Sequence, residues 1–316
     1  MAEVHHKMSV YDGMFLWGGV SVTGKRRTNE DADCLVDLRN VGPRFDDADS
    51  QTWTFVGLFD GHGTERVSQF CAEEVPKQLV GSKPFPENMP DALKRAFCYS
   101  DKFILRSLYL YAGLSNQFLG GSTALSAVVT DETIWVANAG DSRCVYIPRG
   151  DMNSCLSVTE DHKPNNDTER ERVEAVGSRV VPQNWGNVYR VAGLLSVARA
   201  IGDQELKGCG ISSYPDIHVV ETRVVDVLIF GCDGLWDVCK TNEIPEMIRG
   251  PVERGALPHE IAAHIANEAL IRHSLDNVTA VVGIRPSVYT SDAEAGEWVE
   301  ARKKDGSVRD LSSVNV

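Results

Sequence analysis

Residues 54–64 read Thr-Phe-Val-Gly-Leu-Phe-Asp-Gly-His-Gly-Thr, an apolar run that stops abruptly at Asp60. An apolar run of this length bounded by glycine is typical of a core strand, and it places the carboxylate of Asp60 at the strand's end. Asp-Gly after a strand is also the usual signal of a hairpin turn. A functional interpretation therefore depends on whether the same pattern recurs elsewhere in the chain.

The pattern of an apolar run that delivers an acid recurs along the chain. Asp141 and Asp233 each follow such a run, and Asp276 stands just before the apolar run of residues 278–284. Strand ends can bring distant acids together, and converging carboxylates repel one another unless cations neutralise them. Oxygen ligands without His or Cys favour Mg²⁺ or Mn²⁺ over zinc. The pattern thus predicts metal-assisted hydrolysis, in which bound ions lower the pKa of a water molecule.

The composition limits the classes of partner. The chain has 316 residues, 42% of them apolar, and a formal net charge of −13, which disfavours nucleic acid and anionic membranes as main partners. Its 8 cysteines lack the paired spacing of zinc or thioredoxin-type sites, which favours reduced thiols. The first residues contain no apolar signal core, and Ala2 stands where N-myristoylation requires glycine. We therefore expect a cytoplasmic or nuclear location.

The apolar spacing predicts strands interleaved with helices. We expect strands at residues 15–21, 34–38, 52–59, 121–130, 133–137, 143–147, 188–191, 194–201, 217–220, 227–231 and 277–284. We expect helices at residues 63–79, 91–111, 166–177 and 257–273. Short turns between the middle strands predict antiparallel pairing, with Asp141 in one of the turns. Successive helices after a strand pair indicate a helical layer over a sheet.

The character of the sequence changes after Pro286. Residues 291–304 carry acids first and bases last, which matches a helix dipole, and Trp298 is the one large apolar anchor. No linker divides the rest of the chain. We expect one domain at residues 1–287, and a C-terminal extension at residues 288–316 made of a short helix and a loose tail.

Two other phosphate chemistries are disfavoured by the residues. Gly19 to Lys25 spells the G-x-x-x-x-G-K of a phosphate-binding loop, but Arg26 follows where Ser or Thr must ligate magnesium, and no apolar helix comes next. A nucleotide hydrolase of that type is therefore a weak alternative. None of the 8 cysteines is followed by Arg after five residues, which excludes a cysteine-based phosphatase.

A series of short motifs resembles that of the metal-dependent protein phosphatase 2C family, in the family's order. The motifs are Arg26 to Ala32, Phe59 to Gly63, Gly121 to Ala124, Ala139 to Arg143, Asp161 to Pro164, Ala198 to Asp203, Cys232 to Asp237, and Asp276 with Asn277. They cover the chain from about residue 18 to residue 284. The resemblance implies that residues 1–287 form a catalytic domain with an α+β fold, an antiparallel β-sandwich flanked by helices on both faces in four α/β/β/α layers.

The resemblance also implies a centre of two Mg²⁺ or Mn²⁺ ions per chain, with a weaker third ion in many relatives. The implied ligands are carboxylates and one carbonyl, at Asp60, Gly61, Asp233, Asp276, Glu30, Asp31, Asp141 and Asp237. Asp60 would bridge the two ions, and Asp233 and Asp276 would hold one of them. Glu30 would contact the first ion through the ion's water molecules, and Asp31 would support this arrangement without binding the ion directly. Asp141 and Asp237 would share the third ion with Asp233.

The implied reaction is hydrolysis of phosphoserine and phosphothreonine in proteins by a monomeric enzyme, in which a hydroxide held by two ions attacks phosphorus. Arg26 would hold the phosphate, because a guanidinium fork grips two phosphate oxygens. His62 would protonate the leaving oxygen, since its pKa range suits a general acid. The alternative is a catalytically silent phosphoprotein-binding regulator, which would be expected to lack Asp60, Asp233 or Asp276; all three are present.

Some other polar residues are expected to be structural. We interpret Arg143, Arg190 and Arg199 as partners of acids rather than substrate ligands, and Asp203 as a residue that orders its turn.

Overall fold

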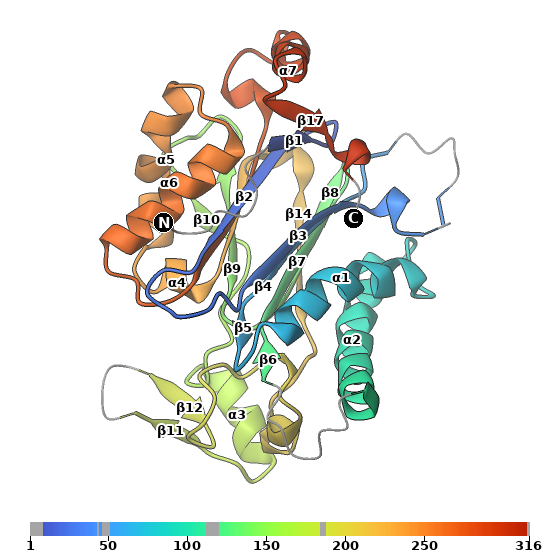
Figure 1. The fold of residues 1–316 in the computed structure, drawn as a ribbon, viewed down its shortest axis with the longest axis vertical. Helices are drawn as coiled ribbons and strands as arrows, with labels where there is room; N and C mark the ends of the chain where they lie inside the picture. Colours follow the sequence, from blue (N-terminus) through green and yellow to red (C-terminus); the bar gives the residue numbers. More distant parts are fainter. Residues whose placement is uncertain (1–8, 43, 46–50, 112–119, 184–187, 315–316) are drawn as a thin grey trace.

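The computed structural model describes residues 9–42, 44–45, 51–111, 120–183 and 188–314. Two sheets pack face to face, and helices cover the outer face of each, so the molecule has four layers (Figure 1). This arrangement confirms the expected helix-flanked sandwich. Within the described residues, no helix is both long and apolar enough to cross a membrane.

The first sheet contains seven strands. Their order is β10 (Leu156–Ser157), β9 (Arg143–Pro148), β15 (Val225–Gly231), β16 (Val278–Ile284), β2 (Leu16–Val22), β1 (Ser9–Tyr11) and β17 (Val308–Asp310). Neighbours pair antiparallel except β1 with β17, which are parallel. All residues of β15, β16 and β2 are buried, because the other sheet covers one face and helices α5 (Ile244–Glu253) and α6 (Pro258–Ile271) cover the other.

The second sheet contains five antiparallel strands. Their order is β14 (Asp216–Glu221), β8 (Thr133–Ala139), β7 (Ala124–Val129), β4 (Thr54–Phe59) and β3 (Ala32–Asp37). Helices α1 (Arg66–Gly81) and α2 (Met89–Tyr111) pack on its outer face. Trp17 and Phe230 from the first sheet meet Leu58 and Leu125 from the second in the core between the sheets. The ends of the strands, and the loops that follow them, therefore lie at the two ends of the sandwich.

A smaller unit lies beyond one end of the sandwich (Figure 1). It contains α3 (Asp167–Ala175) and the hairpin β11 (Val180–Pro182) with β12 (Tyr189–Val191), and short strands β13 (Ile201–Gly202), β6 (Gly121–Ser122) and β5 (Gly61–His62) lie next to it. The expected strand at residues 194–201 is wrong, since only Ile201 and Gly202 pair as a strand. Its apolar side chains instead pack with Val173 and Val191 in a separate cluster, so the run reflects a small local core.

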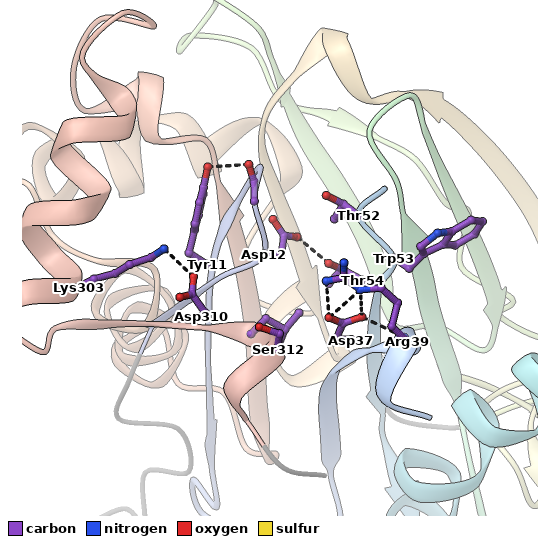
Figure 2. Close-up of a pocket in the computed structure, with 12 residues that line it drawn as sticks. Tyr11, Asp12, Asp37, Arg39, Thr52, Trp53, Thr54, Lys303, Asp310 and Ser312 are labelled. Carbon is purple, nitrogen blue, oxygen red and sulfur yellow. Dashed lines mark hydrogen bonds and ion pairs between the residues drawn. The ribbon is translucent and has the colours of Figure 1, made fainter. Parts of the chain in front are cut away.

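The C-terminal extension contains the expected helix, α7 (Ala295–Lys304), but its tail is not loose. Strand β17 pairs with β1, and Val308 and Leu311 are buried because the tail covers the otherwise open edge of the first sheet. The tail, residues 11–13 and the start of β4 line an open pocket of about 230 Å³ (Figure 2). The division of the chain at residue 287 stays a prediction.

Candidate active site

Five acids that are distant in sequence line one pocket of about 210 Å³, at the end of the sandwich where β4 and β15 finish. They are Glu30, Asp60, Asp141, Asp233 and Asp276. Asp60 follows β4, whereas Asp233 follows β15 and begins helix α4 (Asp233–Trp236). Asp276 precedes β16, which pairs antiparallel with β15, so the two acids are delivered to the same end. The antiparallel pairing of β15 with β16 thus explains how Asp233 and Asp276 reach the same end of the sandwich.

Asp60 is fixed by its backbone. Its N–H donates to Thr123 Oγ1 at 3.1 Å, and the N–H of Thr123 donates to the carbonyl of Asp60 at 2.9 Å. Gly61 must be glycine, because a Cβ there would lie 2.2 Å from the carbonyl oxygen of Glu30. This close approach places Glu30 next to Gly61 and therefore near Asp60. All three residues line the pocket.

The loops that carry Asp233 and Asp276 are packed together at backbone distance. A Cβ on Gly234 would lie 1.9 Å from the carbonyl oxygen of Asn277, so no larger residue fits. The side chain of Asn277 accepts from the N–H of Glu30 and donates to the carbonyls of Thr23 and Thr28, each at 2.9 Å. Asn277 therefore ties the loop that carries Arg26 and Glu30 to the start of β16.

The acids of the pocket repel one another. Desolvation, followed by the charge of Asp233, raises the pKa of Asp60 well above its ordinary value. Desolvation, followed by the charge of Asp141, does the same to the pKa of Asp233. Asp31 lies behind the pocket, where desolvation raises its pKa to about 6, and it accepts a hydrogen bond from Thr279 Oγ1 at 2.6 Å. Such a cluster would be stabilised by added positive charge.

The donor set fits hard divalent cations. The carboxylates and the Gly61 carbonyl are oxygen ligands of the kind that Mg²⁺ and Mn²⁺ prefer. Cys232 is the one soft donor nearby, with ligand atoms of Asp31, Asp60 and Cys232 all within 4.8 Å of one another. Burial raises the pKa of the Cys232 thiol well above its ordinary value, and its sulfur accepts the N–H of Thr279 at 3.1 Å. A neutral, hydrogen-bonded thiol is a poor ligand.

The two residues expected to act on substrate both line the pocket. Arg26 donates from Nη2 to Asp276 Oδ2 at 2.6 Å, and its side chain is 56% exposed. His62 donates from Nε2 to both carboxylate oxygens of Asp203, at 2.8 and 2.9 Å. Asp203 is buried and has a backbone φ of +49°, so its turn aims the carboxylate at the imidazole.

The two outer acids lie beside a lysine. Asp141 is buried in the turn between β8 and β9, as expected, and Lys163 Nζ lies 2.6 Å from its Oδ2. Asp237 is exposed, and its Oδ1 lies 3.7 Å from the same ammonium group. Asp237 does not line the central pocket but lines an adjoining groove of about 390 Å³, which Asp233 and Asp276 also reach.

The sequence interpretation missed several contributors to the site. Thr123, Asn277, Lys163 and Asp203 each contact a proposed ligand or His62, and each lies inside one of the motifs. Their place in the motif series was the only available signal. Arg143 and Arg199 pair with acids as expected. Arg190 instead donates to the carbonyl of Leu194 at 2.7 Å and lines both the pocket and the groove.

Comparisons with known proteins show the family of the chain. The sequence model of the family described as protein phosphatase 2C matches residues 17–278. Probable protein phosphatase 2C 45 of Oryza sativa subsp. japonica is 34% identical over 271 residues, which span 86% of this chain and 88% of the relative. Probable protein phosphatase 2C 22 of Arabidopsis thaliana is 34% identical over 84% of this chain and 67% of its own length.

The fold also matches a solved structure. The serine-threonine phosphatase 2C from Toxoplasma gondii superimposes with a TM-score of 0.76 at 23% identity, over 90% of this chain and 99% of that one. At that identity the likeness supports the fold, and the family model and the plant relatives carry the assignment. The chain belongs to the protein phosphatase 2C family.

Proposed function

We propose that this chain hydrolyses phosphoserine and phosphothreonine in proteins with the help of divalent ions. The observation that carries the proposal is the convergence of five acids, Arg26 and His62 on one pocket. When bound, two Mg²⁺ or Mn²⁺ ions would lower the pKa of a water molecule and supply the hydroxide that attacks phosphorus. Asp60, Gly61, Asp233 and Asp276 would hold these ions, with Glu30 and Asp31 supporting them.

The chain's own side chains would bind the phosphate and move the proton. A guanidinium has five N–H donors, and the contact of Arg26 with Asp276 uses one of them, so others can reach phosphate oxygens. Because Nε2 of His62 is occupied by Asp203, Nδ1 is the ring atom that would pass a proton to the leaving oxygen. Asp203 would hold the ring and stabilise its charged form, as a carboxylate does for a histidine in other hydrolases.

The test is release of phosphate from a phosphothreonine peptide by the full chain. We expect turnover with Mg²⁺ or Mn²⁺, its loss after chelation, and a decrease of at least about a hundredfold in Asp60→Asn. The control is Asp131→Asn, the same change in the turn between β7 and β8 at the other end of the sandwich. Turnover that survives chelation would contradict the metal mechanism. Phosphopeptide binding without turnover would favour the silent regulator.

A further inference from the structure

Lys163 places a positive charge between the two outer acids. Its ammonium group lies 2.6 Å from Asp141 and 3.7 Å from Asp237. A lysine side chain is ordinarily an ammonium ion at neutral pH. This one lies between the two acids that are expected to share an outer metal ion.

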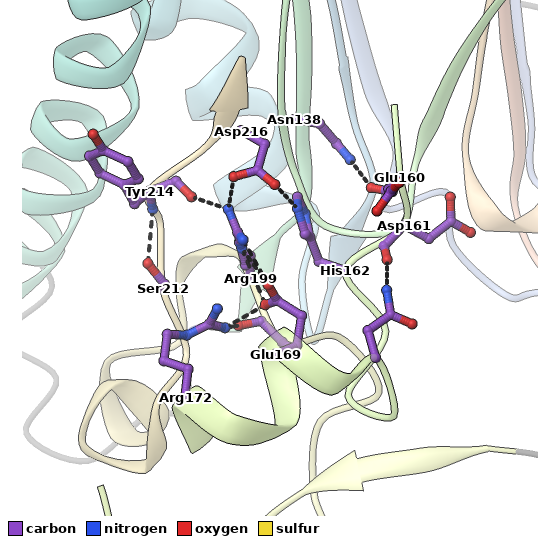
Figure 3. Close-up of polar contacts among 12 residues, drawn as sticks. Asn138, Glu160, Asp161, His162, Glu169, Arg172, Arg199, Ser212, Tyr214 and Asp216 are labelled. Atoms are coloured by element: carbon purple, nitrogen blue, oxygen red, sulfur yellow. Dashed lines mark hydrogen bonds and ion pairs between the residues drawn. The ribbon is translucent and has the colours of Figure 1, made fainter. Parts of the chain in front are cut away.

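The segment around Lys163 is held in place by its neighbours. Asp161 accepts two hydrogen bonds from Arg143, at 2.9 and 2.8 Å. His162 is buried, accepts the N–H of Gly140 on Nδ1 at 3.1 Å, and points its Nε2 toward Asp216 (Figure 3). Gly140 is the residue just before Asp141. The same contacts therefore fix both partners of the Lys163–Asp141 pair.

We propose that Lys163 is a tethered cation that competes with a third divalent ion for Asp141 and Asp237. The inference rests on the proposed function, because it assumes that inner ions bind at Asp60, Asp233 and Asp276. A monovalent and a divalent cation a few ångströms apart repel strongly. Lys163 must therefore leave Asp141 before a third ion can bind there. Its side chain is 31% exposed and lines the groove of about 390 Å³, so the ammonium group can move into this groove when it leaves Asp141.

The competition acts mainly on the outer ion, because Asp141 and Asp237 are the two acids with which Lys163 pairs. Binding of the outer ion includes the cost of breaking a charge-assisted contact of 2.6 Å. Removing the ammonium group should therefore tighten the weakest divalent binding step by about 10- to 100-fold, which corresponds to about 1.4 to 2.8 kcal/mol. The outer ion should also displace the lysine into solvent.

The test measures Mn²⁺ binding by calorimetry and electron paramagnetic resonance in the metal-free full chain. We expect Lys163→Met to tighten the weakest binding step by at least about tenfold, with the tighter steps changed less than threefold. The matched control is Lys207→Met, since Lys207 is also a half-buried lysine paired with an aspartate, Asp101, at 3.0 Å. An unchanged weakest step in Lys163→Met would overturn the proposal.

Two further measurements keep the test decisive. Asp237→Asn removes an exposed partner, which should not affect folding, and it should abolish the gain when combined with Lys163→Met. In the wild-type chain titrated with diamagnetic Mg²⁺, the Lys163 ammonium resonance in a ¹⁵N spectrum should shift most during the weakest binding step; a resonance that does not respond to that step would also overturn the proposal. Failure of the proposed function is distinct, because it would appear as a wild-type chain without tight Mn²⁺ binding or phosphate release.

Discussion

The contact between His62 and Asp203 is the most specific arrangement of single residues in the pocket. The carboxylate is buried, it accepts from Nε2 through both oxygens, and it stands on a turn residue with a left-handed backbone. Few residues adopt that backbone conformation without strain, and Asp and Asn are among them. The position is therefore suited to holding a carboxylate against an imidazole.

We expect Asp203→Asn to slow hydrolysis of a phosphothreonine peptide about 10- to 100-fold while hydrolysis of an activated aryl phosphate changes little. Asn keeps the backbone conformation but loses the charge that stabilises a protonated His62. His62→Gln should show the same selectivity for poor leaving groups. The measurement is kcat for both substrates in each variant. Equal slowing of both substrates would show that the pair has a structural role and does not serve proton transfer.

The sequence allowed the acids to be predicted but not the residues that hold them. Asp60, Asp233 and Asp276 could be found because each interrupts an apolar run at a strand end, a pattern visible in one dimension. Asn277 and Thr123 act through hydrogen bonds to backbone atoms of residues far away in sequence. Such contacts depend on how loops meet, and no local pattern reports them.

Among the elements, α3 depends most on a single buried charge. Glu169 is 1% exposed and accepts hydrogen bonds from Arg199, at 2.7 and 3.1 Å, while Arg172 lies 2.6 Å away (Figure 3). Arg199 also donates to Asp216 of β14 at 2.6 Å. The ion cluster therefore joins α3 to the edge of the second sheet, next to the segment that carries His162.

We expect Glu169→Gln to destabilise the chain by about 3 to 5 kcal/mol at pH 7, because two arginines lose their buried partner. Desolvation alone would raise the pKa of Glu169, but hydrogen bonds from Arg199 and Arg172 hold it below its ordinary value of 4.5. This stabilisation is complete above pH 4.5 and is lost as the pH falls through the lowered pKa. The difference between wild type and variant in urea unfolding should therefore shrink below pH 4.5.

The control for this prediction is Glu205→Gln, an exposed glutamate close to α3 in the same small unit. It should change the free energy of unfolding by less than about 0.5 kcal/mol at every pH. A difference between wild type and Glu169→Gln that stays constant from pH 7 to pH 4 would contradict the assignment of the effect to the charge.

Elements that depend little on distant contacts were predicted well from the sequence, and elements that depend on them were not. The bounds of β15, β16 and α6 were predicted within a few residues, because their long apolar runs show directly which residues are buried. Residues 194–200 looked like a strand for the same reason. Their apolar side chains fill the small core next to α3, and the backbone of Ala198 bonds to His162 rather than to a strand. An apolar run in the sequence therefore does not distinguish a core strand from an irregular segment that packs in a small local core.

At the scale of the whole molecule, the end opposite the pocket is closed by polar contacts and by the C-terminal tail. Asp12 accepts hydrogen bonds from Trp17 Nε1 at 2.6 Å and from Thr54 Oγ1 at 2.8 Å, which joins the two sheets. Thr54 begins β4 and Asp60 follows its last residue. Six residues of extended strand span about 20 Å, so the tail lies a full strand length from the pocket.

Truncation after Gly306 should therefore lower stability without changing the chemistry. The deletion removes β17 and exposes the sites filled by Val308 and Leu311, each of which contributes about 1.5 to 3 kcal/mol. We expect the melting temperature to fall by about 5 to 10 °C, while kcat/KM at 25 °C stays within about twofold.

Val308→Ser should reproduce part of the loss, and Arg309→Ser, the exposed neighbour on the same strand, should not. A truncated chain that melts at the wild-type temperature would show that the tail adds nothing to the sandwich, and loss of turnover in the folded truncated chain would show that the two ends are coupled.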